Sequence, residues 1–185
     1  MHGKGMLGFL TSLFFRPPSS LAHRWRFALL LALFAGISRA APPVYEYQLK
    51  TAYIFHLAEL TEWPETSAHI ICISGKTNLR EHLPALQGQA IGGQQVHINI
   101  APEHLEECNI LFVGYESKGL AELVEIANAY HILLVSDQPN FAQQGGMIEI
   151  ALRDDKLKLI VNLPAVKNAG LKLSSKLLRI AEIQE

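Results

Sequence analysis

The sequence predicts an α/β fold: a three-layer sandwich-like domain with a mostly parallel sheet, helices on both faces and an antiparallel hairpin near the C-terminus. Short apolar runs at residues 108–113 and 131–135 alternate with a helical pattern at residues 117–129. Strands that are apolar throughout indicate a sheet covered on both faces by βα crossovers. The runs at residues 147–152 and 156–161 flank a polar turn and predict the hairpin.

The other elements are placed by their apolar spacing and by the residues at their ends. Apolar residues recur at helical spacing over residues 46–61, and Trp63-Pro64 ends this helix because proline disfavours helix in the residue before it. The remaining predictions are a strand at residues 69–74, a short helix at 78–86, a strand at 95–100 after the Gly92-Gly93 turn, a short helix at 164–169 ended by Gly170, and a final helix capped by Ser174 or Ser175 and reaching residue 183.

The first 40 residues predict a secretory signal. They hold five basic residues and no acidic residue. Arg24 and Arg26 precede the apolar run at residues 27–37, and Ser38-Arg39-Ala40 then places small residues at the −3 and −1 positions of a cleavage site after Ala40. The apolar run is about half of the ~20 residues that a membrane-spanning helix needs, so a membrane anchor is the weaker alternative. We therefore expect export to the periplasm.

The mature chain, residues 41–185, is expected to form one domain. Hydrophobic residues make up 49% of the sequence and charged residues 18%, which favours a folded core over disorder. The mature part holds 11 basic and 17 acidic residues, and this acidic excess disfavours nucleic acid as a partner. Pro42 and Pro43 predict an extended start.

Cys72 and Cys108 are the only cysteines of the chain. An exported protein folds in an oxidising compartment, where such a pair favours a disulfide. Closing a loop of about 36 residues would stabilise the fold by about 4 kcal/mol on the chain-entropy account. The alternative is two buried thiols that never meet.

The sequence contains no pattern that predicts catalysis, a metal site or a cofactor. It has no HExxH zinc motif and no GxSxG nucleophile turn. Gly75-Lys76-Thr77 resembles the end of a phosphate-binding loop, but the glycine required at position 70 is Ile70. These residues therefore predict a simple turn between a strand and a helix. Asp137, at a strand end, predicts either a ligand contact or a helix cap.

The strongest candidate for a ligand site lies near the C-terminus. Lys172 lies beside a predicted helix N-terminus, and with the hydroxyls of Ser174 and Ser175 and the amide of Asn162 it forms a candidate anion-binding site. The alternative, which the residue types favour, is helix capping with a solvated lysine. No positioned acid–base pair accompanies these residues, so an enzyme is not expected.

Several motifs resemble the YfiR-like family in their order and spacing. They cover about residues 47–182, and they are Lys50-Thr51-Ala52-Tyr53-Ile54-Phe55-His56-Leu57-Ala58, Thr61-Glu62-Trp63-Pro64, Ile71-Cys72-Ile73-Ser74-Gly75, Cys108-Asn109-Ile110-Leu111-Phe112-Val113, Val135-Ser136-Asp137, Phe141, Gly145-Gly146-Met147-Ile148, Ile160-Val161-Asn162-Leu163 and Ala169-Gly170-Leu171-Lys172-Leu173-Ser174-Ser175-Lys176-Leu177-Leu178.

The resemblance implies a compact periplasmic α/β protein, often a homodimer, without catalytic activity. It implies a repressor that holds a membrane diguanylate cyclase inactive through the periplasmic domain of that enzyme, with an outer-membrane lipoprotein able to sequester it. Release would raise cyclic di-GMP and promote biofilm growth. The resemblance also supports the disulfide between Cys72 and Cys108. The rival hypotheses are a periplasmic receptor for a small ligand or anion, without a cyclase partner, and an enzyme.

Overall fold

The computed structural model describes residues 43–64 and 69–184. The signal predicted at residues 1–40 and the extended start predicted at Pro42 lie outside this part of the chain. Pro43 is the first residue of a helix, so the extended start is wrong at that residue. Proline fits the first helical turn because the amide hydrogen that it lacks would have no partner there. None of the described helices has the length and apolarity needed to cross a membrane.

An eight-stranded mixed sheet forms the centre of the fold. Its strand order is β10-β8-β7-β6-β5-β2-β4-β3, and two pairs of neighbours are antiparallel, β7 with β8 and β3 with β4. The strands are β2 (His69–Ser74), β3 (Ala90–Ile91), β4 (Gln94–Ile100), β5 (Ile110–Val113), β6 (Leu133–Ser136), β7 (Ile148–Arg153), β8 (Lys156–Asn162) and β10 (Glu182–Gln184). The mostly parallel sheet confirms the predicted fold class.

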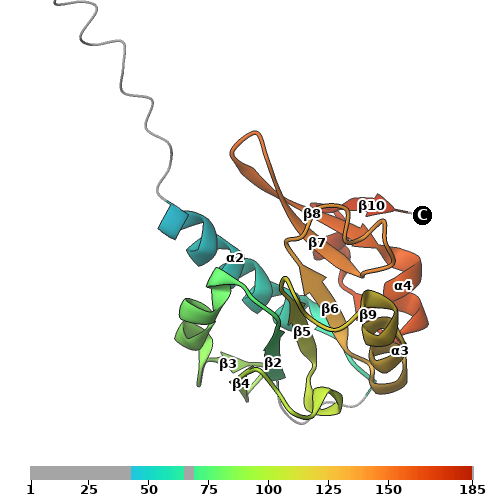
Figure 1. Ribbon diagram of the computed structural model, residues 1–185, viewed down its shortest axis with the longest axis horizontal. Helices are drawn as coiled ribbons and strands as arrows, with labels where there is room; N and C mark the ends of the chain where they lie inside the picture. The colour runs from blue at the N-terminus through green and yellow to red at the C-terminus, as the bar shows by residue number, and fades with distance from the viewer. Residues whose placement is uncertain (1–42, 65–68, 185) are drawn as a thin grey trace, which may run out of the picture. The chain divides into compact units, whose positions relative to one another are not determined.

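Helices cover both faces of this sheet. Figure 1 shows α2 on one side of the central strands and α3 and α4 on the other. The helical elements are α2 (Pro43–Leu60), α3 (Leu120–Tyr130), α4 (Leu163–Asn168), α5 (Ser175–Leu178) and three short 3₁₀ helices, η1 (Asn78–Glu81), η2 (Leu83–Leu86) and η3 (Leu105–Glu107). A small antiparallel pair, β1 (Thr61–Glu62) with β9 (Lys172–Leu173), joins the end of α2 to the segment after α4.

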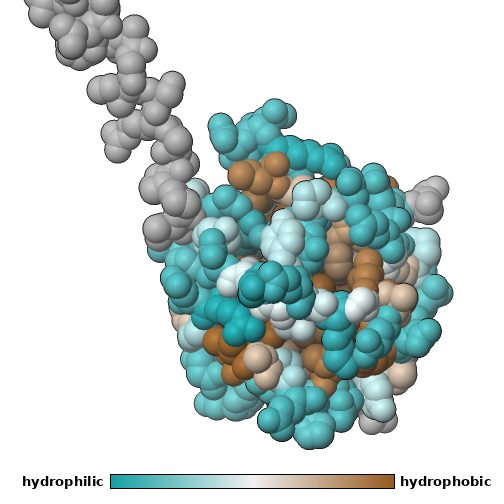
Figure 2. Space-filling view, in the orientation of Figure 1, coloured by the Kyte–Doolittle hydropathy of each residue, from teal (hydrophilic) through white to brown (hydrophobic). Residues whose placement is uncertain are grey.

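The core lies between the sheet and the helices. Every residue of β5 and β6 is buried, as expected for strands covered on both faces. Phe112, Ile110 and Leu133 are fully buried. Complete burial of one such side chain stabilises a fold by ~1.5–3 kcal/mol, so these two strands contribute substantially to the apolar stabilisation at the centre of the sheet. Figure 2 shows one face of the molecule, whose surface is largely hydrophilic with hydrophobic groups between the hydrophilic ones.

The predicted hairpin is confirmed, with a tighter turn than the sequence suggested. Arg153 pairs with Lys156, so only Asp154 and Asp155 form the loop. Both have positive φ values, 51° and 57°. A two-residue loop with two left-handed residues is the turn whose twist matches paired strands, and aspartate tolerates that conformation.

Two helix predictions need correction. The final helix predicted to reach residue 183 ends after one turn, at Leu178, and Glu182–Gln184 form β10 instead. The edge of β8 supplies backbone partners for these residues, and such tertiary pairing overrides local helical spacing. The helix predicted at residues 78–86 is two 3₁₀ turns, η1 and η2. Pro84, at the start of η2, removes a backbone donor that a continuous helix would need.

The disulfide between Cys72 and Cys108 is present. Cys72 lies in β2, Cys108 lies just before β5, and their Cα atoms are 5.9 Å apart. Both residues are buried. The bond therefore ties together two neighbouring parallel strands of the core.

Candidate functional site

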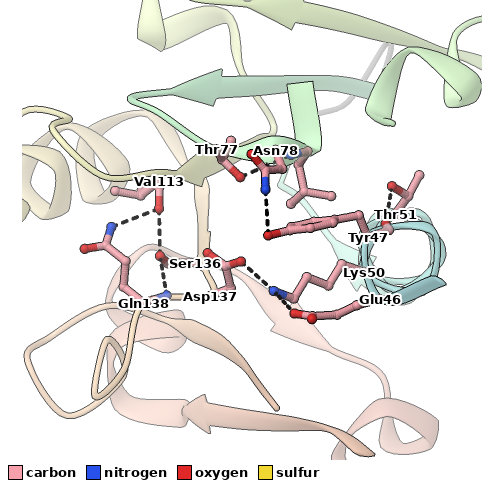
Figure 3. Close-up of polar contacts among 11 residues, drawn as sticks. Glu46, Tyr47, Lys50, Thr51, Thr77, Asn78, Val113, Ser136, Asp137 and Gln138 are labelled. Atoms are coloured by element: carbon pink, nitrogen blue, oxygen red, sulfur yellow. Dashed lines mark hydrogen bonds and ion pairs between the residues drawn. The ribbon is translucent and has the colours of Figure 1, made fainter. Parts of the chain in front are cut away.

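The first half of α2 meets the sheet at the carboxyl ends of β2, β5 and β6 (Figure 3). Lys50 is 4% exposed, and its Nζ lies 2.6 Å from Oδ2 of Asp137, which follows β6. The same Nζ lies 2.7 Å from Oε1 of Glu46, one turn earlier in α2. A buried ammonium needs such partners because an unpaired charge away from water is strongly destabilising. Two carboxylates therefore hold Lys50 at this edge.

The surroundings of Lys50 keep it charged. Burial acts to lower the pKa of its ammonium group, but the hydrogen bonds to Asp137 and Glu46 and the attraction of their charges outweigh burial. The pKa of Lys50 is therefore raised above its ordinary value. A lysine that stays protonated cannot act as a general base or as an amine nucleophile near neutral pH. The group is suited to holding α2 in place.

Tyr47 connects α2 to the segment that follows β2. Its ring stacks on the ring of His82, with centroids 5.7 Å apart and planes inclined by 8°. Its hydroxyl oxygen accepts a hydrogen bond from Nδ2 of Asn78 at 2.9 Å. Nζ of Lys50 lies 5.1 Å from the centre of the Tyr47 ring, within the range of a cation–π contact. One aromatic side chain thus links the ion cluster to η1.

The hydroxyl and amide groups at the end of β6 bind the neighbouring strand. Oγ of Ser136 donates to the carbonyl oxygen of Val113 at 2.6 Å and accepts from the backbone N–H of Gln138. Nε2 of Gln138 donates to the carbonyl oxygens of Val113 and Gly114. These contacts close the gap between β5 and β6 and leave the Ser136 hydroxyl hydrogen committed to a backbone acceptor. The serine is therefore not arranged as a nucleophile.

Backbone also fills the position where an open α/β sheet commonly binds ligands. The chain runs from β2 to one side and from β5 to the other, so their carboxyl ends form the topological switch point. There the N–H of Lys76 donates to the carbonyl oxygen of Tyr115 at 2.6 Å, and the N–H of Tyr115 donates back at 2.9 Å. A Cβ atom at Gly114 would stand 2.6 Å from the carbonyl oxygen of Lys76. Glycine permits this close approach, which occupies the crevice.

The Gly75-Lys76-Thr77 segment is a turn between a strand and a helix, as predicted. Oγ1 of Thr77 accepts a hydrogen bond from the N–H of Leu79 and caps η1. Gly75 has a φ of +81°, a left-handed conformation that glycine adopts without strain.

The four residues of the predicted anion site have separate local roles. Asn162 caps α4 by accepting from the N–H of Ala165, and its amide donates to the carbonyl oxygen of Ala142. Ser174 caps α5 by accepting from the N–H of Leu177. Lys172 and Ser175 are exposed in β9 and at the start of α5. The two caps belong to different helices. Anion binding by this group stays a prediction, and an unchanged anion affinity in Lys172→Ala would contradict it.

A sequence profile of the YfiR/HmsC-like family matches residues 47–182. The chain belongs to the YfiR-like family. The match covers nearly all of the described residues and confirms the resemblance noted in the motifs. This family comprises periplasmic, non-catalytic regulators of diguanylate cyclase signalling. A comparison with curated proteins gives no significant match.

The structure explains why two of the YfiR-like motifs occur together. Lys50 belongs to the helix motif and Asp137 to the strand motif that ends β6, and the ion pair joins them across 87 positions of sequence. Sequence reasoning missed this pair and assigned Asp137 to a ligand or a cap. One feature of the sequence indicated this pair. Lys50 shares a helix face with Ile54 and Leu57, which are buried, and a lysine on a buried face requires an acidic partner.

Proposed function

We propose that this YfiR-like protein is exported, loses its signal after Ala40, and represses a membrane diguanylate cyclase by binding the periplasmic domain of that enzyme. The observation that carries the proposal is the family match over residues 47–182. The site chemistry is compatible with it, because Lys50 and Ser136 are committed to structural contacts. Such a protein acts by shifting the equilibrium between the active and inactive states of its partner.

Repression by binding requires a preference for one state of the partner. A ligand that binds two states equally shifts nothing, and moving an equilibrium from 1:99 to 99:1 takes a ~10⁴-fold preference. A rigid surface raises the affinity for the preferred state because little of that surface has to be ordered on binding. The disulfide between Cys72 and Cys108 and the ion pairs of Lys50 supply rigidity here.

Exposed apolar side chains supply candidate anchors for a protein partner. Aromatic and aliphatic residues that desolvate at the centre of an interface carry much of its binding energy. The described large hydrophobic residues with the highest exposure are Tyr45, Tyr115, Tyr130, Leu152 and Ile180. They lie on several elements, and substitution can test each of them separately.

The test is crosslinking in the periplasm, followed by affinity capture of the tagged mature chain and mass spectrometry. We expect recovery of one inner-membrane protein that carries a diguanylate cyclase domain. A different membrane sensor would retain regulation by contact and refute the cyclase as its target. Recovery of nothing above a tagged, unrelated periplasmic protein would refute contact regulation and favour the small-ligand receptor.

The homodimer and the sequestering lipoprotein belong to the same proposal. Sedimentation equilibrium of the purified chain is expected to give twice the mass of the mature protein. The same crosslinking experiment is expected to recover an outer-membrane lipoprotein under conditions that relieve repression. A monomer at all concentrations would refute the dimer without affecting the cyclase test.

A further inference from the structure

A cavity of about 430 Å³ lies between α2, β8 and α5, away from the Lys50 cluster. Its lining includes Leu159 and Leu177, which are buried, and Leu49 and Tyr53 on α2, which are partly buried. The volume is within the ~300–1,000 Å³ range of small-molecule sites, and such sites are mostly apolar with a few polar groups. The lining of this cavity is likewise mostly apolar with a few polar groups.

One side chain of the lining is unusually exposed for its type. Ile180 follows α5 and is 66% exposed, the highest value among the large hydrophobic residues described. A large aliphatic side chain beside an apolar cavity gains stabilisation when an apolar ligand removes both from water. The position of Ile180 thus indicates that the ligand has an apolar body.

The charge of the lining indicates the polar end of the ligand. Of the residues that the structure describes, Lys176 is the only lysine or arginine that lines the cavity, and no aspartate or glutamate among them lines it. Among residues 43–64 and 69–184, Lys176 forms no ion pair or hydrogen bond through its side chain. His56 also lines the cavity, and its Nδ1 lies 3.1 Å from Oε2 of Glu59. A free ammonium beside an apolar cavity is complementary to a single negative charge.

We propose that this cavity binds an amphipathic monocarboxylate, with its chain against Leu159 and Leu177 and its carboxylate on Nζ of Lys176. A medium-chain fatty acid has this chemistry. The proposal goes beyond regulation by protein contact, because it assigns a small-molecule site to a surface that needs no partner protein. Its test therefore uses the purified chain alone, and its failure leaves the crosslinking result untouched.

The direct test is calorimetric titration of decanoate, below its micelle concentration, into protein purified from the periplasm. We expect saturable binding of one decanoate per chain. Octanoate is expected to bind about fifteenfold more weakly, since each buried CH₂ contributes about fourfold in affinity. Decyltrimethylammonium, with the same chain and the opposite charge, is expected to bind more weakly than decanoate.

Two matched pairs of variants locate the site. Lys176→Gln is expected to weaken decanoate binding about fivefold, whereas Lys167→Gln, an exposed lysine on α4, is expected to leave it unchanged. Ala52→Trp would fill the cavity from α2 and abolish binding. Ala121→Trp, at an exposed position of α3, would have no effect.

Three results would overturn the proposal. The first is the absence of saturable decanoate binding by a folded protein. The second is an equal loss of affinity in Lys176→Gln and Lys167→Gln, which would make the attraction a property of net charge. The third is binding to vesicles of anionic phospholipid without binding of free decanoate, which would assign the surface to a membrane.

Discussion

The carboxyl edge of the sheet and the cavity between α2, β8 and α5 differ in how the charges of their lysines are satisfied. At the carboxyl edge of the sheet, Lys50 is paired with two carboxylates and the crevice is filled by backbone hydrogen bonds. At the cavity between α2, β8 and α5, Lys176 forms no ion pair with any residue of 43–64 or 69–184, and Ile180 is mostly exposed. The contacts around Lys50, at the edge where open α/β sheets commonly bind ligands, therefore hold the fold together here. The lysine without an ionic partner lies at the cavity that α2 forms with β8 and α5.

The largest expected loss of stability comes from removing the ion pairs of Lys50. Lys50→Met leaves the carboxylates of Asp137 and Glu46 without their cation, and loss of one partner of a buried pair destabilises by ~3–5 kcal/mol. Urea denaturation measures this loss. The exposed pair of Lys118 and Glu122 supplies the control, because Lys118→Met is expected to change stability by less than ~0.5 kcal/mol.

A double substitution separates charge from packing at the same place. Lys50→Met combined with Asp137→Leu removes both charges of the closest pair, and it is expected to recover part of the stability lost in Lys50→Met. A double variant less stable than the single one would mean that Asp137 stabilises the fold independently of Lys50.

The second effect tests the backbone contact that fills the crevice. Gly114→Ala would place a methyl group against the carbonyl oxygen of Lys76, and such overpacking destabilises by ~1–3 kcal/mol. Gly119→Ala is the matched control, because nothing lies within 4 Å of a Cβ atom there. Thermal unfolding of the two variants measures the difference. Equal melting temperatures would show that the crevice can open without loss of stability.

The pH dependence of stability provides a third test, which concerns the ion pairs of Lys50. The pKa of Lys50 is raised in the folded state, so its contribution is fully present below the unfolded value of about 10.4 and is lost as the pH rises through the folded value. The stability gap between the wild-type chain and Lys50→Met is therefore expected to be constant near neutral pH and to shrink at alkaline pH. Urea denaturation at pH 7 and at several values above pH 10 measures it, and a gap that widens there contradicts the assignment.

The smallest expected effect concerns the cavity region. Ile180 is mostly exposed, so Ile180→Ser is expected to change the free energy of unfolding by less than ~0.5 kcal/mol. A loss of stability above ~2 kcal/mol would mean that Ile180 supports the fold. The cavity region would then be a structural part of the core, like the surroundings of Lys50.

The sequence predicted the parts of the fold that depend on short-range patterns. The buried strand at residues 69–74 and the β7–β8 hairpin follow from apolar runs and turn residues, and the structure confirms both. The helix predicted for the last segment was wrong because the residues of β10 pair with β8, and the local spacing of apolar residues does not reveal that contact. The β3 strand was missed for a different reason, because two residues are too few to carry a periodic pattern.

The sites were less predictable than the fold. The Lys50–Asp137 pair and the cavity each join segments far apart in sequence, so their geometry appears only in the folded chain. The serine and asparagine of the predicted anion site were recognisable as caps, and Ser174 and Asn162 do cap helices. A capping pattern and an anion-binding pattern use the same residue types, and sequence alone does not separate them.

The most direct test of the proposed function is the concentration of cyclic di-GMP in cells that lack this chain. If the protein represses a membrane diguanylate cyclase, deletion is expected to raise cyclic di-GMP and complementation with the full chain to restore the lower level. Complementation with a chain lacking residues 1–40 is expected to fail, because that protein would stay in the cytoplasm. An unchanged cyclic di-GMP level after deletion, under conditions in which the chain is expressed, would contradict the account.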